Sequence, residues 1–121
     1  MHQTRLEQDP RFIHGIERFN AQEFDEAGDA FEELFFEAIV GELEFVRLFL
    51  QLSTGCLHAE RRQPRAAIER LQEGVLALDR VTDHRGYDLT ALRADTIRLI
   101  NQLRTGAAES GCLRISTVNP S

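Results

Sequence analysis

The 121-residue sequence lacks the features of a membrane or exported protein. Its richest apolar stretch is interrupted by Arg47 and Gln51, so no run is long enough to span a bilayer. The first ten residues contain no apolar core and do not form a signal peptide. The two cysteines, Cys56 and Cys112, do not have metal-ligand spacing, and a disulfide between them is not expected in a reducing compartment. We therefore expect a cytoplasmic protein.

Signatures of catalysis are also absent from the sequence. It has no glycine-rich phosphate loop, no nucleophile elbow and no dinucleotide fingerprint. It has no Glu-x-x-His pair, so the usual di-iron signature of helical bundles is missing. Ser53 and Cys56 precede His58 in the chain, but on a regular helix they point away from it. No complete catalytic set remains.

The charge distribution argues against nucleic acid as a partner. The net charge is −6, and the acidic residues are concentrated between Glu17 and Glu44. Such a field repels phosphate backbones. Basic residues gather at positions 61–70, but no aromatic residues are interleaved with them for base stacking. We interpret that basic group as a solvated helix end.

What the sequence does contain is a series of amphipathic helices. Asp9 and Pro10 form a helix start, Asn20 can take the left-handed conformation that ends a helix, and Asp88 suits an N-cap. Apolar residues recur every three or four positions, which predicts helices over residues 9–19, 22–38, 42–61, 64–81 and 89–103. The third is apolar almost all round and should be central. The expected fold is all-α, a five-helix bundle of two antiparallel, tetratricopeptide-like hairpins plus a C-terminal helix.

These helices divide the chain into three parts. We expect an N-terminal arm over residues 1–8, a single helical domain over residues 9–105 and a flexible C-terminal tail over residues 106–121. Leu113 and Ile115 in the tail could instead dock on the body. Phe36 projects from the acidic side of the second helix. We expect it to cover the start of the third helix, the alternative being an exposed apolar spot for self-association.

A weak internal repeat has an offset of forty residues. The matched positions in the first copy include an apolar residue, a glycine and an alanine that would allow close helix crossing. The corresponding pairs are Phe12 and Leu52, Gly15 and Gly55, Ile16 and Cys56, Phe24 and Pro64, Ala27 and Ala67, and Phe31 and Leu71. The alternative is that any two helical hairpins match at a few apolar positions.

One candidate site lies between the second and third helices. A polar stripe, comprising Glu44, Arg47, Gln51, Thr54 and His58, runs along the otherwise apolar third helix and either faces solvent or lines a pocket. Acids one turn apart on the second helix could bind a divalent cation together with His58. The tentative ligand pocket comprises Asp29, Glu32, Glu33, Gln51 and His58, and the metal ligands, if any, are Asp29, Glu33 and His58. Simple solvation of both polar faces is the alternative.

Several segments resemble the DUF309 family of small all-helical proteins, over roughly residues 15–103. The family pattern includes Phe-Asn, an acid-Ala-His-Glu segment, Leu-Glu-x-x-Trp, a Gln followed by a His, a Pro-x-x-Ala hairpin and a Gly-Ile-Asp helix start. The matching residues here are Phe19 and Asn20, residues 26–29, Phe31, Glu32 and Phe35, Gln51 and His58, Pro64 and Ala67, and residues 86–88. The resemblance implies a compact helical bundle and no biochemical activity, because the family's function is unassigned.

The chain departs from this pattern at positions that bear on a site. Gly28 stands where the family has a histidine, Asp29 where it has a glutamate, and Phe35 where it has a tryptophan. Leu48 stands where a glycine is expected. We hypothesise that Leu48 fills the space that the histidine would occupy. If a functional site of the family needs this histidine, this chain has lost it.

Two functions from different classes follow. The first is a non-catalytic helical binding or assembly module, a homodimer with a possible further protein partner and no cofactor. The second is a metal-assisted hydrolase-like or small-ligand site between the second and third helices, which would take a divalent metal.

Overall fold

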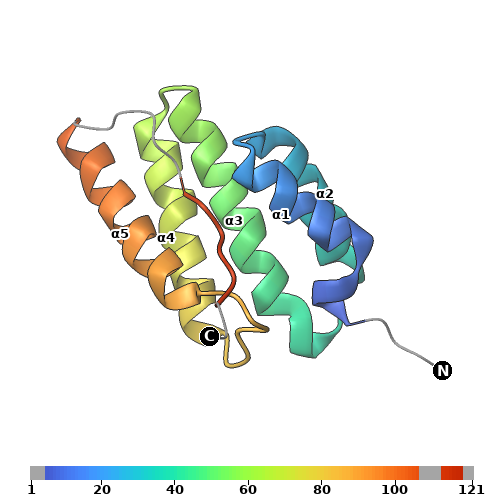
Figure 1. The fold of residues 1–121 in the computed structure, drawn as a ribbon. Helices are drawn as coiled ribbons and strands as arrows, with labels where there is room; N and C mark the ends of the chain where they lie inside the picture. The colour runs from blue at the N-terminus through green and yellow to red at the C-terminus, as the bar shows by residue number, and fades with distance from the viewer. Residues whose placement is uncertain (1–4, 107–112, 119–121) are drawn as a thin grey trace.

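The computed structural model describes residues 5–106 and 113–118 and shows an all-α fold (Figure 1). Five α-helices follow one another, α1 (Pro10–Asn20), α2 (Phe24–Glu37), α3 (Leu43–Glu60), α4 (Pro64–Arg80) and α5 (Leu89–Thr105). Short 3-10 helices, η1 (Leu6–Gln8) and η2 (Val40–Glu42), precede α1 and α3. The predicted all-α bundle is confirmed. Within the described residues, no helix is long and apolar enough to cross a membrane.

The helix starts follow from the capping residues that the sequence offers. The side chain of Asp9 accepts a hydrogen bond from the backbone N–H of Arg11, with Pro10 in the first helical position. Asp88 does the same for Ala91 at the start of α5. Helix α1 ends at Asn20, as expected, but Asn20 does not adopt the expected left-handed conformation. The left-handed residue is Gln22, with φ 65°, and the Asn20 side chain has another use, described below.

The two hairpins have the same local structure at an offset of forty residues. Gln22 in the α1–α2 turn and Arg62 in the α3–α4 turn are both left-handed, with φ 65° and 57°. A Cβ atom added to Gly15 would lie 2.8 Å from the ring of Phe31, and one added to Gly55 would lie 2.8 Å from Leu71. Because these contacts are themselves forty residues apart, the repeat is a repeat of packing geometry and not a chance match of apolar residues.

Helix α3 is the centre of the bundle, as its apolar circumference predicts. It packs against α2 on one side and α4 on the other, while α1 packs against α2, and α5 packs against α4 (Figure 1). Val46, Leu48, Phe49 and Leu52 have no exposed surface. Phe12, Phe31, Phe45, Phe49 and Tyr87 form a continuous aromatic cluster that joins α1, α2 and α3, with ring centroids 5.0–6.2 Å apart.

The C-terminal segment and Phe36 differ from what we expected of a flexible tail and a covered side chain. The described part of the C-terminal segment, residues 113–118, agrees with docking, because Leu113 and Ile115 are buried in the core. The remaining tail residues, 107–112 and 119–121, lie outside the described residues. Phe36 does not cover the start of α3, since it is largely exposed. Phe36 lies on the solvent-facing side of α2, whereas Phe24 and Phe31 of the same helix are buried in the core.

Candidate functional site

The residues of the predicted pocket are divided between surface and half-buried positions. Asp29, Glu32 and Glu33 are exposed on α2, whereas Gln51 and His58 are half-buried on α3. All five residues of the polar stripe on α3 are half-buried, so the stripe is neither a fully solvated face nor the wall of a closed cavity. The α2 acids and the α3 stripe therefore do not converge on one enclosed site.

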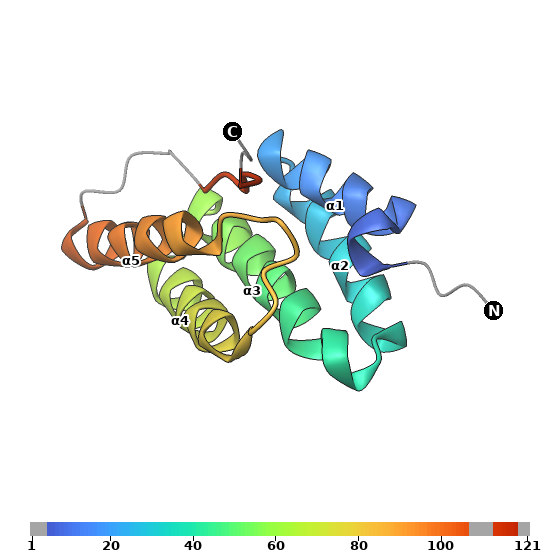
Figure 2. The ribbon, with the colours of Figure 1, turned by 60° about the horizontal axis from the view of Figure 1, so that its bottom comes forward.

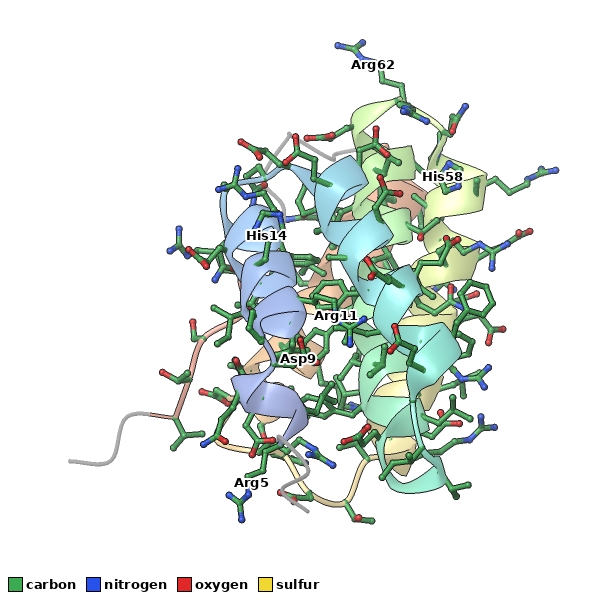
Figure 3. All side chains as sticks on the ribbon, turned by 90° about the vertical axis from the view of Figure 1, so that its right-hand side faces the viewer. Arg5, Asp9, Arg11, His14, His58 and Arg62 are labelled. Atoms are coloured by element: carbon green, nitrogen blue, oxygen red, sulfur yellow. The ribbon has the colours of Figure 1, made fainter. Side chains whose placement is uncertain are left out.

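His58 is engaged at the turn that follows α3. Its Nδ1 lies 2.7 Å from Oε1 of Gln63, five residues along the chain, and donates if the amide oxygen is the acceptor. In the first hairpin, Arg18 donates to Glu23 across the same five-residue interval, also at 2.7 Å. Arg18 and His58 are forty residues apart, as are Glu23 and Gln63. His58 therefore occupies a position whose repeated role is to tie the turn between two helices. Figure 3 shows it at that end of the molecule, near Arg62.

The structure does not bring the expected metal ligands together. Among residues 5–106 and 113–118, no three His, Cys, Asp or Glu side chains lie close enough to hold a metal ion. Asp29 and Glu33 face α1, and His58 lies at the α3–α4 turn. The helical spacing placed the two acids one turn apart correctly, but it could not show toward which neighbouring helix they point.

An open groove of about 440 Å³ lies between α1 and α2. Five of its seven lining residues are polar or charged, and two of these, Arg11 and His14, lie on α1 and were not singled out from the sequence. The full set is Pro10, Arg11, His14, Glu26, Asp29, Ala30 and Glu33. Arg11 and His14 are three residues apart on the polar side of α1. This helical spacing is the sequence feature that could have indicated that both side chains line one groove. Figure 3 shows both on the face that α1 and α2 share.

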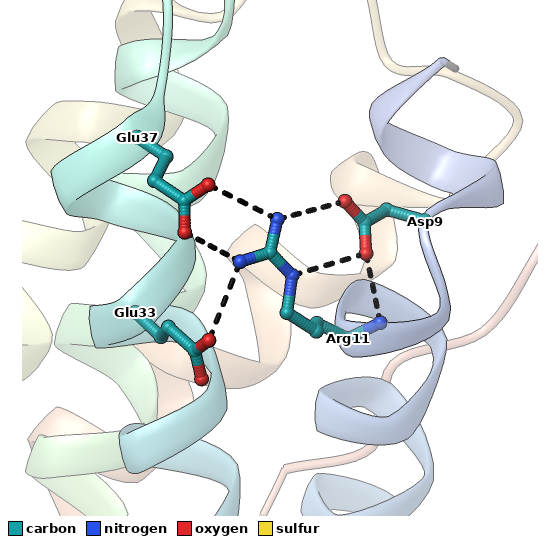
Figure 4. Close-up of polar contacts among 4 residues, drawn as sticks. All are labelled: Asp9, Arg11, Glu33 and Glu37. Atoms are coloured by element: carbon teal, nitrogen blue, oxygen red, sulfur yellow. Dashed lines mark hydrogen bonds and ion pairs between the residues drawn. The ribbon is translucent and has the colours of Figure 1, made fainter.

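Arg11 closes one end of this groove by joining three carboxylates (Figure 4). Its Nε and Nη2 donate to Asp9 at 3.3 and 3.2 Å, and Nη1 donates to Glu33 at 3.4 Å and to Glu37. The hydrogen bonds from Arg11 hold the pKa of Asp9 below its usual value, against a smaller opposing effect of burial. The same carboxylates raise the pKa of Arg11. One guanidinium therefore faces three carboxylates, so this end of the groove keeps a net negative charge, and the contacts tie α1 to the C-terminal turn of α2.

Arg47 takes part in another group of polar contacts between helices. Its guanidinium lies 5.3 Å from the centroid of the Phe35 ring, a cation–π distance. Its Nε lies 3.6 Å from Glu44, which in turn is 4.0 Å from Arg80 on α4. Arg47 Nε and Glu44 Oε2 are buried atoms without a hydrogen-bond partner in the described structure, so the ion pairs and, for Arg47, the Phe35 ring compensate for their burial. The N-terminal half of the stripe, Glu44 and Arg47, thus links α2, α3 and α4.

Gly28 leaves an unfilled position on the α2 face that meets α3. A Cβ atom there would meet only the Cβ of Ser53, at 3.8 Å, which is an ordinary van der Waals contact. No atom of Leu48 lies within 4 Å of it. The hypothesis that Leu48 compensates for the missing histidine is therefore not supported. Leu48 is instead a fully buried core residue.

Comparison with known proteins finds a similarity to one family over the hairpin region. A family model described as a domain of unknown function, DUF309, matches residues 12–69. The resemblance to DUF309 is confirmed. The DUF309 match covers most of α1, all of α2 and α3 and the start of α4. It ends before residues 86–88, which we had included in the resemblance from the sequence. No curated protein and no solved structure matches the chain.

Proposed function

We propose that the chain is a non-catalytic binding and assembly module that forms a homodimer through an apolar patch at the end of α2. The patch consists of Phe36, Ile39 and Val40, whose side chains are 79%, 55% and 94% exposed. This cluster is the observation that carries the proposal. Three large apolar residues exposed within five positions of the chain are typical of a protein contact surface, whereas single exposed apolar residues are not.

The internal repeat provides a comparison within the same molecule. Phe36 corresponds to Leu76 on α4, which is also exposed, at 49%. The positions equivalent to Ile39 and Val40, however, are Asp79 and Arg80. Asp79 pairs with Arg93 at 2.9 Å, and Arg80 approaches Glu44. Asp79 and Arg80 are the last two residues of α4, whereas Ile39 and Val40 follow the end of α2 at Glu37, so the two pairs differ in backbone structure. Because Ile39 and Val40 are largely exposed and lie outside the core, the fold itself does not require an apolar pair there.

The size of the patch is compatible with the centre of an interface. A phenylalanine at this exposure presents on the order of 150 Å² of apolar surface. The three side chains together supply part of the roughly 800 Å² that each partner buries in a standard interface. A two-fold axis through the patch would place each copy's apolar residues on those of the other. The polar residues around it would form the rim.

Nothing in the geometry favours the hydrolase-like alternative to the same degree. The acids on α2 point toward α1, and His58 ties a turn. The DUF309 family has no assigned function that would add support to a reaction.

The decisive experiment exchanges the patch for the residues that the second hairpin already uses. The variant carries Ile39→Asp and Val40→Arg, and the matched control carries Leu76→Asp at the equivalent of Phe36. Sedimentation velocity should show a dimer for the wild type, with a dissociation constant on the order of 1 μM. The patch variant should be monomeric with unchanged helical circular dichroism, and the control should remain dimeric. A wild type that stays monomeric at about 100 μM would contradict the proposal.

A further inference from the structure

Residues 113–118 lie as an extended segment between the end of α1 and the loop that precedes α5 (Figure 2). Burial alternates over residues 113–116, and Thr117 and Val118 are exposed. Leu113 and Ile115 are buried in the core, while Arg114 and Ser116 are exposed. This two-residue period is that of a strand with one face inserted and one face in solvent. An extended strand on the surface of a helical bundle has the form of a bound peptide.

Asn20 holds the middle of the segment through the backbone. The backbone N–H of Ile115 donates to Asn20 Oδ1 at 2.8 Å, and Asn20 Nδ2 donates to the carbonyl oxygen of Ile115 at 2.9 Å. A side-chain amide that engages both groups of one residue reproduces the pairing of a neighbouring β-strand. Gln22 Nε2 adds a hydrogen bond to the carbonyl oxygen of Leu113 at 3.2 Å.

The second half of the segment pairs with the loop before α5. The N–H of Asp88 donates to the carbonyl oxygen of Ser116 at 2.8 Å, and the N–H of Val118 donates to the carbonyl oxygen of Gly86 at 2.7 Å. Tyr87 and Thr117 form an antiparallel bridge between these bonds. This is strand addition to a short exposed edge, a recurrent mode of peptide recognition.

All five hydrogen bonds use backbone atoms of the segment, and only Leu113 and Ile115 insert side chains. We infer that the surface formed by Asn20, Gln22 and residues 86–88 is a peptide-binding site for an extended segment of a partner protein. The chain's own residues 113–118 fill this site in cis. The partner segment carries apolar residues two positions apart, and the second of them cannot be proline because its N–H donates to Asn20.

Occupation in cis makes binding competitive. A segment attached to the same chain acts at an effective concentration on the order of millimolar, so a partner peptide must displace it. The apparent association constant of an added peptide equals the intrinsic constant multiplied by the fraction of molecules in which the site is vacant. Weakening the chain's own segment therefore strengthens binding of the added one.

The test uses the full chain with Leu113→Asp and Ile115→Asp, which empties the site, and a fluorescent blocked peptide of residues 113–118 as the probe. Anisotropy titration should show at least tenfold tighter binding to this variant than to the wild type. Adding Asn20→Ala to the variant should weaken binding at least tenfold, whereas Asn101→Ala, at an exposed asparagine on α5, should not. A peptide with aspartate at the Ile115 position should not bind.

Failure of the folded variant to bind the peptide at millimolar concentration would overturn the inference. If the double variant loses its helical circular dichroism, Asn20→Ala in the otherwise unchanged chain provides the test. It should accelerate amide hydrogen exchange at Ile115 relative to Asn101→Ala, and unchanged exchange would overturn the inference. A wild-type dimer that Asn20→Ala dissociates, and that the Ile39→Asp, Val40→Arg variant retains, would assign the site to exchange between two copies and overturn the partner-protein assignment.

Discussion

Helix glycines in this protein should respond in opposite directions to the same change to alanine. Gly28, on α2, has room for a methyl group, because the added Cβ would meet only Ser53 at 3.8 Å. Alanine has a higher helix propensity than glycine by about 1 kcal/mol, largely because it loses less backbone freedom on folding. Gly28→Ala should therefore stabilise the fold by about 1 kcal/mol.

Gly15 and Gly55 stand where the two helices of each hairpin touch. An added Cβ on Gly15 would lie 2.8 Å from the Phe31 ring, which is fully buried and packed at 5.5 Å against Phe49. One on Gly55 would lie 2.8 Å from the Leu71 side chain and 3.3 Å from its backbone nitrogen. Overpacking of this kind costs about 1–3 kcal/mol, which exceeds the propensity gain. Because backbone is involved, Gly55→Ala should be the more damaging, with a net loss of about 2 kcal/mol.

Urea unfolding followed by circular dichroism would measure all three variants on one scale. The separation of about 3 kcal/mol between Gly28→Ala and Gly55→Ala corresponds to roughly 10 °C in Tm for a chain of this size. Comparable m-values would show that only the native state has changed. The packing argument would be refuted if Gly28→Ala were destabilised, or if Gly55→Ala were as stable as the wild type.

Three further predictions concern single polar contacts. Asp9→Asn keeps the N-cap but loses the pairing with Arg11. Because the folded pKa of Asp9 is lowered from 3.8, the variant should be less stable than the wild type at pH 7. This difference in stability should vanish as the pH falls through the folded pKa of Asp9. Tyr87 is the only tyrosine, and burial followed by the charge of Glu7 raises its pKa, so Glu7→Gln should lower that pKa in a tyrosinate absorbance titration; an unchanged value would exclude the Glu7 contribution. His58→Ala should reduce stability by about 1 kcal/mol in thermal unfolding and leave Zn²⁺ titration by calorimetry unchanged, whereas loss of a stoichiometric Zn²⁺ site would restore the metal hypothesis.

The helices could be predicted because local signals agree with one another. Apolar periodicity places the third helix at 42–61, against Leu43–Glu60 in the structure. The caps Asp9 and Asp88 and the first-position prolines mark the starts of α1, α5 and α4. The error at Asn20 has a physical cause. The left-handed residue is fixed by the turn that both hairpins repeat, so Gln22 and Arg62 adopt it despite the usual preference for asparagine or glycine.

The candidate site was predicted less well because direction cannot be obtained from spacing alone. The sequence correctly places Asp29 and Glu33 one turn apart, but whether they face α1 or α3 depends on how α2 rotates about its axis, which the core phenylalanines decide. The role of His58 depends on a residue across a turn. The alternation of Leu113 and Ile115 was visible in the sequence, yet a strand of this kind acquires meaning only when Asn20 lies beside it.

The repeat limits where a specific function can lie. Contacts that occur in both hairpins, such as Gly15 with Phe31 and Gly55 with Leu71, belong to the architecture and would be kept in any protein with this packing. A function that depends on one hairpin must use residues whose contacts differ from those of their counterparts. Val40 is exposed where its counterpart is Arg80, and Asn20 binds a strand where its counterpart is Glu60, a carboxylate that cannot donate a hydrogen bond. Both proposed contact surfaces meet this criterion, whereas His58, which repeats the role of Arg18, does not.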